Sequence, residues 1–103
     1  MIFSPNNPFS VFPLGVILLS SCPAFVLFDT GATHSFVASQ FVKRNKIINT
    51  SGDMEWHVST PMGKTMITTE MCKSCKLEIG GRTLLANLII LEMSGYDVIL
   101  GMD

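Results

Sequence analysis

The stretch Val26-Leu27-Phe28-Asp29-Thr30-Gly31-Ala32 places an acidic residue directly after a run of apolar residues. The apolar run predicts a short buried strand, and Asp29 then stands at the entrance to a loop. A carboxylate in that position costs free energy unless it is used or satisfied. Gly31 has no side chain to keep the backbone away from the carboxylate, and Thr30 offers a hydroxyl that can brace the loop. An ordinary Asp-Gly turn remains an alternative interpretation.

A second informative segment, Asp97-Val98-Ile99-Leu100-Gly101, lies near the end of the chain. Taken alone, it predicts a buried strand, Tyr96 to Leu100, that ends at a glycine. Between the two segments, Ser35 is placed to cap a helix that runs to about Arg44.

The rest of the chain has the pattern of short strands joined by tight turns. Two hairpins are expected, one with its tip at Pro61-Met62-Gly63-Lys64 and one turning at Gly80-Gly81. This pattern predicts a mostly-β domain, barrel-like or sandwich-like, with one helix. The predicted strands are Leu14–Leu19, Ala24–Phe28, Trp56–Thr60, Thr65–Thr69, Lys76–Ile79 and Thr83–Leu91.

Together, the two segments resemble the retroviral and retrotransposon aspartic proteases. In that family an apolar strand carries Asp-Thr/Ser-Gly-Ala, and a later apolar-apolar-Gly segment crosses beneath the catalytic loop. The longer sequence from Val26 to Phe36, with Asp97 to Asp103, is similar to the protease region of plant gypsy-type LTR retrotransposon polyproteins. The resemblance implies a retropepsin-like closed β-barrel, half of a two-lobed acid protease, with one short helix after the catalytic loop.

The resemblance also assigns roles to residues. Asp29 would be the catalytic carboxylate of an aspartic endopeptidase, supported by its loop neighbours Thr30, Gly31 and Ala32. The hairpin tip would be the flap that covers the substrate, and the late apolar segment would form the second loop crossing. These two segments consist of Pro61, Met62, Gly63 and Lys64, and of Ile99, Leu100 and Gly101, respectively.

Hydrolysis by this chemistry needs two adjacent carboxylates that share a proton. None of the other aspartates, Asp53, Asp97 and Asp103, is followed by Thr-Gly or Ser-Gly. The second carboxylate is therefore expected from a second copy of the chain, in a homodimer with two-fold symmetry. The implied substrate is a polypeptide, in particular a retroelement polyprotein. The alternative is a catalytically inactive or domesticated interaction module that keeps the fold.

The family continues into a helix and a terminal strand beyond the apolar-apolar-Gly segment. Because this sequence ends at Asp103, we expect a protease domain over residues 14–103 that is truncated at its C-terminal side. Residues 1–13 are rich in Pro, Asn and Ser around isolated Phe residues, and they predict a loose, disordered lead-in.

Composition narrows the remaining possibilities. The chain has 103 residues, which favours one domain, and its 48% hydrophobic and 15% charged residues suggest a surface that is covered by a partner. A net charge of −1 without a basic run argues against nucleic-acid binding. The apolar segment Val11 to Ser21 is too short to span a membrane, and no membrane association is expected.

The cysteines and histidines predict no cofactor and no metal site. An odd cysteine count without a dense framework favours reduced thiols and an intracellular, cytoplasmic setting. Cys72-x-x-Cys75 can signal zinc or redox chemistry, but the other possible ligands are scattered, so structural thiols in or beside a strand are expected. His34 is expected to act locally at the helix entry, and His57 to lie on a strand near the flap.

Overall fold

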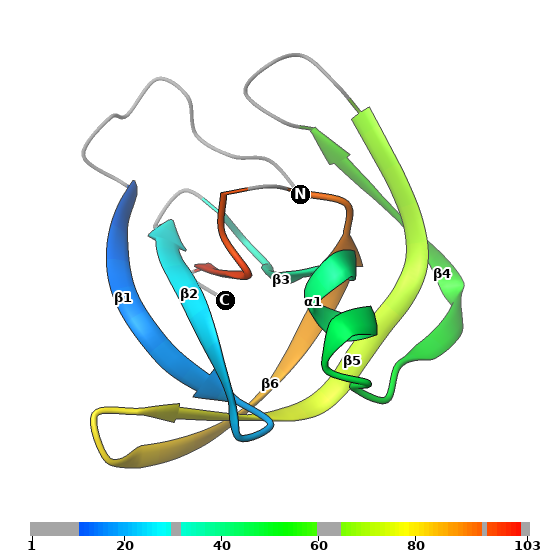
Figure 1. Ribbon diagram of the computed structural model, residues 1–103. Coiled ribbons are helices and arrows are strands. Elements are labelled where there is room, and N and C mark those ends of the chain that lie inside the picture. The colour runs from blue at the N-terminus through cyan, green and yellow to red at the C-terminus, as the bar shows by residue number, and fades with distance from the viewer. Residues whose placement is uncertain (1–10, 30–31, 60–64, 94, 102–103) are drawn as a thin grey trace.

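The computed structural model describes residues 11–29, 32–59, 65–93 and 95–101 (Figure 1). Seven strands and one short helix follow one another along this part of the chain. Their order is β1 (Val11–Leu19), β2 (Cys22–Asp29), β3 (Ser35–Ala38), α1 (Ser39–Arg44), β4 (Thr50–Ser59), β5 (Thr65–Ile79), β6 (Arg82–Leu91) and β7 (Val98–Gly101).

The strands form one sheet in the order β1-β2-β7-β3-β6-β5-β4, and an additional pairing joins β1 to β5. That pairing closes six of the strands into a barrel and leaves β4 as an outer strand on β5. The closure depends on the length of β5, which curves past β4, then β6, and finally meets β1 at Leu77 and Glu78 (Figure 1). A closed barrel removes most of the free strand edges that invite aggregation.

The closed β-barrel with one short helix, predicted by the family resemblance, is confirmed. The two hairpins are also present, since β4 pairs with β5 and β5 pairs with β6 in antiparallel register. The first strand begins earlier than the pattern indicated, at Val11 instead of Leu14. Pro13, the last residue of the predicted lead-in, is part of β1 and lies at a register shift between β1 and β2, where a missing amide donor is tolerated.

The predicted helix start at Ser35 was wrong. Residues Ser35–Ala38 form β3, which pairs in parallel with β6 and antiparallel with β7, and the helix begins only at Ser39. The spacing of Val37 and Phe41 fits a helix, but Phe36 and Val37 are fully buried on opposite faces of the sheet. Two-sided burial between neighbouring strands outweighs the weak local preference for helix.

Two apolar clusters lie on the two faces of the central strands. The larger cluster fills the barrel and includes Val26, Val37 and Val98. The smaller cluster contains Phe36 and Ile99 on the opposite face, where Val58 of β4 covers them. Because successive side chains of a strand alternate between faces, each of these strands contributes to both clusters.

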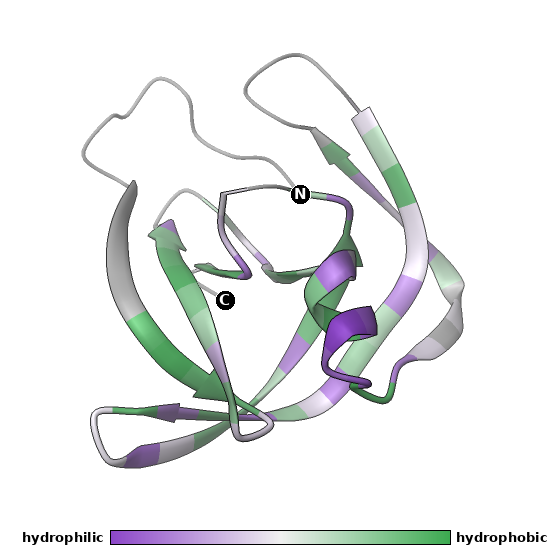
Figure 2. Ribbon diagram, viewed as in Figure 1, coloured by the Kyte–Doolittle hydropathy of each residue, from purple (hydrophilic) through white to green (hydrophobic). Residues whose placement is uncertain are grey.

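Hydrophilic residues concentrate at α1 and recur in bands along β5, whereas β2 and the coloured part of β1 are mostly hydrophobic (Figure 2). Among the described residues, no helix is long and apolar enough to cross a membrane.

Candidate active site

Asp29 is the last residue of β2 and is completely buried. Its backbone lies between two neighbours, opposite Val11 of β1 and Gly101 of β7. The side chain of Leu27, two residues earlier, packs on the smaller apolar cluster. Since residues two apart share a face of a strand, the Asp29 carboxylate lies on that same face of the sheet. The fold thus delivers an acidic group to the end of a buried strand, beside a buried apolar cluster.

Gly101 lies tightly against the loop that follows Asp29. A Cβ atom at this position would lie 2.4 Å from the carbonyl oxygen of His34 and 2.6 Å from that of Ala32. Real side chains do not occupy such distances, so only glycine lets β7 pass against the loop that follows Asp29. The Gly101 amide also donates a hydrogen bond to the Ser35 hydroxyl at 3.1 Å.

The loop after Asp29 is held at both of its ends. The amide of Ala32 donates to the carbonyl oxygen of Asp29 at 3.2 Å, and Ala32 itself is buried. The His34 ring meets the Trp56 ring edge-on, with centroids 4.9 Å apart, and lies 3.0 Å from the Thr33 hydroxyl. The contact with Trp56 joins the loop to β4, the strand that leads into residues 60–64.

The structure brings together the predicted first and second site segments. In the parallel register of β2 and β7, Leu27 lies opposite Ile99, Phe28 opposite Leu100, and Asp29 opposite Gly101. Ala32 lies directly against Gly101, as described above. Thr30 and Gly31, and the flap residues Pro61, Met62, Gly63 and Lys64, lie outside the described residues.

The two histidines lie on different elements. His57 is on β4, as the sequence predicted. His34 precedes β3 and is not at a helix entry, because the helix starts at Ser39.

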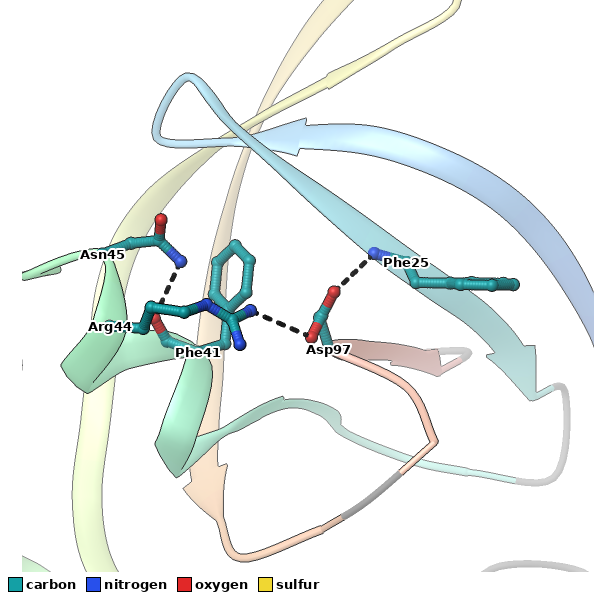
Figure 3. A network of polar contacts seen from close by, with 5 residues as sticks. All are labelled: Phe25, Phe41, Arg44, Asn45 and Asp97. Carbon is teal, nitrogen blue, oxygen red and sulfur yellow. Dashed lines mark hydrogen bonds and ion pairs between the residues drawn. The ribbon is translucent and has the colours of Figure 1, made fainter.

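Asp97 holds three separate parts of the barrel together (Figure 3). Its Oδ2 atom accepts a hydrogen bond from the Phe25 amide at 2.8 Å, and its own amide donates to the Phe25 carbonyl at 2.9 Å. Its carbonyl accepts from the Ala38 amide at 2.8 Å, and its Oδ1 atom lies 3.7 Å from the Arg44 guanidinium. Asp97 therefore holds the start of β7 in place against two elements. It is bonded to β2 through Phe25, and to the N-terminal end of α1 through Ala38.

We expect Asp97→Ala to lower the free energy of unfolding by about 1–3 kcal/mol, because the Phe25 amide loses its acceptor. The ion pair contributes less, since the Arg44 side chain is 65% exposed. Arg44→Gln should accordingly cost no more than about 1 kcal/mol. Chemical denaturation of both variants measures the difference. Equal losses in the two variants would show that the ion pair, and not the bond to the backbone, is the important contact.

Two residues important for the site were not recognised from the sequence. Ser35 was interpreted as a helix cap, but its hydroxyl oxygen accepts a hydrogen bond from the Gly101 amide. Asp97 was named only as the first residue of the second segment and as an aspartate without a following Thr-Gly, and no structural role was assigned to its side chain. A signal for Asp97 existed, because a charged residue immediately before a buried strand usually has a specific partner.

The described residues offer no group of three or more His, Cys, Asp or Glu side chains that could hold a metal ion. Cys72 and Cys75 both lie in β5, where the sequence placed them, and both are free thiols.

Comparisons with known proteins agree with this geometry. The sequence profile of the retroviral aspartyl protease family matches residues 10–103. Among solved structures, the chain is similar to the EIAV protease in complex with the inhibitor HBY-793, with a TM-score of 0.68 and 21% sequence identity. That similarity covers 92% of this chain and 85% of the viral one. A search of curated proteins gave no match. Because the profile spans nearly the whole chain and the barrel is shared, the chain belongs to the retroviral aspartyl protease family and is a retropepsin-like aspartic protease domain.

Proposed function

We propose that the chain is one protomer of a homodimeric aspartic endopeptidase, with Asp29 of each protomer supplying half of the catalytic pair. The observation that carries this proposal is the combination at the end of β2. A fully buried carboxylate stands there against a glycine of β7 that admits no side chain. Such a construction gives up stability to position one acidic group, and that is typical of a functional site.

The chemistry requires a pair because a lone carboxylate cannot be acid and base at once. Two carboxylates at close range share one proton, since like charges about 3 Å apart cannot both ionise. The unprotonated member accepts a proton from the attacking water, while the protonated member donates one to the carbonyl oxygen of the scissile peptide bond. Thr30, Gly31 and Ala32 would hold the loop in position. In this scheme a two-fold axis passes close to Asp29.

The proposed substrate is a polypeptide that contributes apolar side chains. Leu27 and Ile99 are on the face of the sheet that carries Asp29, next to Trp56 and Val58 of β4. Leu27 and Trp56 are the half-buried members of this group, and their accessible apolar atoms beside the carboxylate favour apolar side chains in the substrate. The similar EIAV protease was solved with an inhibitor bound, which is consistent with a ligand site in this fold. Processing of a retroelement polyprotein is the biological role that we infer.

We further infer that residues 61–64 act as a flap. The strands that flank this segment are β4 and β5, and Trp56 of β4 contacts His34 in the loop after Asp29. A hairpin with its base beside the loop can reach over a bound peptide. Closing it would exclude water and strengthen the electrostatic interactions at the carboxylates.

A peptidase assay at mildly acid pH tests the proposed activity. We expect cleavage of an unstructured polypeptide, inhibition by a pepstatin-like statine compound, and no effect of a zinc chelator, because carboxylates activate the water. Cleavage that is lost with the chelator and restored by zinc would contradict the carboxylate mechanism. No cleavage at any protein concentration would favour an inactive interaction module.

The shared site also predicts how activity depends on protein concentration. If two chains form one site, specific activity should fall on dilution through the dissociation constant of the dimer, in proportion to the dimer fraction. Activity and molecular mass measured across the same dilution series should change together. A specific activity that stays constant while the mass is that of a monomer would refute the shared site.

A further inference from the structure

The helix α1 ends in a turn that places a lysine where glycine is the usual residue. The amide of Ile47 donates a hydrogen bond to the carbonyl oxygen of Val42 at 3.0 Å, and the amide of Lys46 donates to that of Lys43 at 3.4 Å. These two bonds define a Schellman motif, and its left-handed position falls on Lys46, which has a φ of 53°. A Cβ atom is unfavourable in that backbone conformation, and glycine avoids the cost. The turn itself thus gives no reason for a lysine side chain at this position.

Lys46 lines two adjoining pockets. The pockets have volumes of about 400 and 390 Å³, and residues 46–48 line both of them. The first pocket also contains Lys43 of α1, and the second contains Lys73 and Lys76 of β5. Segments that are far apart in the sequence therefore meet here and contribute the same kind of charge. We refer to these two pockets together as the lysine pockets.

Positive charge is concentrated at the lysine pockets. The chain has seven Lys and Arg residues and a net charge of −1, but four of the seven line these two pockets. Two acidic residues accompany them, since Glu70 lines the first pocket and Glu78 forms an ion pair with Lys76, with the Oε1 and Nζ atoms 3.4 Å apart. All four lysines are exposed, so a ligand in solution can reach them. This local excess of positive charge attracts an anion.

An exposed apolar side chain lies among these lysines. Ile48 is 87% exposed, which is the largest exposed fraction of any large hydrophobic residue in the described part of the chain. Ile47 beside it is half-buried against the barrel core, and Val42 and Ile90 complete the apolar lining of the first pocket. A ligand of the lysine pockets can therefore gain from apolar contact as well as from charge.

The composition of the lysine pockets distinguishes between two kinds of polyanion. Proteins that bind single-stranded nucleic acid combine a basic groove with aromatic side chains on which the bases stack. Among the described residues, no aromatic side chain lines either pocket, and the apolar lining is mainly aliphatic. Carboxylates on either side of an aliphatic side chain match lysines on either side of Ile48. The pockets are consequently better suited to an acidic polypeptide than to a nucleic acid.

We propose that the lysine pockets are a docking site for an acidic polypeptide segment in which an aliphatic residue is flanked by Asp or Glu. The carboxylates pair with the lysines, and the aliphatic residue packs on Ile48. The site is remote from Asp29, because Ser20 lines the second pocket just before β2, whereas Asp29 is the last residue of β2. The 8 residues of β2 span about 23 Å. Docking therefore leaves the candidate active site accessible and does not depend on peptidase activity.

A titration followed by the NMR resonances of the backbone amides measures both the affinity and the location of binding. The ligand is a short synthetic peptide with one leucine flanked by glutamates on both sides, added at neutral pH. We expect shifts at residues 46–48 and 73–76 and none at Asp29 or Gly101. Raising the salt concentration from about 50 to about 200 mM should weaken binding severalfold, because salt screens exposed charges. Shifts confined to the Asp29 end, or no binding of millimolar peptide at low salt, would overturn the proposal.

Changes to the ligand separate its charge from its apolar side chain. Replacing the glutamates with glutamines should abolish measurable binding, and replacing the leucine with serine should weaken it severalfold, since the contact with Ile48 is lost. Ile48→Ser in the protein should have the same effect as the serine peptide. An oligothymidylate of equal charge represents nucleic acid. Tighter binding of the oligothymidylate, or a peptide affinity that is insensitive to either replacement, would contradict recognition of an acidic and aliphatic polypeptide.

Lys46→Gly tests whether the lysine serves binding or the end of the helix. Glycine suits the positive φ, so the midpoint of thermal unfolding should stay the same or rise, while the affinity for the peptide falls about two- to fivefold. Arg82→Gln is the matched control, because Arg82 is also exposed but lines neither pocket, and it should leave the affinity unchanged.

Two results of this comparison would overturn the proposal. A lower unfolding midpoint with unchanged affinity in Lys46→Gly would show that the lysine stabilises the end of α1. Equal weakening by Arg82→Gln would show a general attraction between charges without a site. None of these measurements uses peptidase activity, so the docking site and the proposed function can fail separately.

Discussion

Replacing Asp29 with asparagine is expected to abolish peptidase activity and to leave the fold intact. The amide keeps the shape of the carboxylate but cannot exchange the proton that the proposed mechanism requires. A buried amide is also less costly than a buried carboxylate, so the free energy of unfolding should stay the same or rise. We expect activity to fall by at least about 10³-fold. Peptidase kinetics and denaturant unfolding on the same preparation measure both effects.

A matched control keeps this result interpretable. Glu92→Gln makes the same change from carboxylate to amide at an exposed position, and it should change neither activity nor stability. Activity that persists in purified Asp29→Asn would remove Asp29 from the mechanism. A large loss of stability in Asp29→Asn would show that the carboxylate is a structural group.

Gly101→Ala is expected to be the most destabilising single methyl addition in the described part of the chain. The added Cβ would meet backbone oxygens of His34 and Ala32 at 2.4 and 2.6 Å, and backbone atoms cannot move aside as a flexible side chain can. Overpacking typically costs about 1–3 kcal/mol, and we expect this variant to reach or exceed the upper value. Relief of the clash would move the loop after Asp29, so activity should be lost even in the fraction that folds.

Gly52→Ala is the control for Gly101→Ala. Gly52 is also in a strand, but a Cβ there would meet its nearest neighbours, Thr69 and Met54, at 3.8 and 3.9 Å, which are ordinary contacts. Its effect on the free energy of unfolding should stay within about 1 kcal/mol. Thermal and denaturant unfolding of the two variants compare them directly. Similar stability in both would mean that the close approach at Gly101 is relieved without cost.

The sequence was most informative where the chemistry is local. An apolar run that ends in Asp29 and a second run that ends in Gly101 are visible as patterns, and the structure pairs them residue by residue. The turn at Gly80-Gly81 was predictable for the same reason, because both glycines adopt positive φ between two strands. Strand pairing around these points follows from alternation and turn chemistry.

What the sequence did not show depends on contacts between distant segments. The apolar residues Phe36 and Val37 fit either a helix or a strand. They form a strand because their segment pairs with β6 on one side and β7 on the other. The role of Asp97 depends on the Phe25 amide, which is 72 residues away. The β-bulge between Cys72 and Cys75 in β5 could not be predicted from the sequence either, because Ser74, and not a glycine, adopts the positive φ there. In each case tertiary packing overrides a local preference.

The most direct test of the shared site is the activity of wild-type chains mixed with Asp29→Asn chains. A mixed dimer contains only one catalytic carboxylate and should be inactive. After equilibration with an equal amount of the variant, at concentrations where dimers form, activity per wild-type chain should fall to about half, and with a fourfold excess to about one fifth. Glu92→Gln chains added in the same amounts should cause no loss. Activity per wild-type chain that stays constant at every ratio of Asp29→Asn would contradict a catalytic site built from two copies of Asp29.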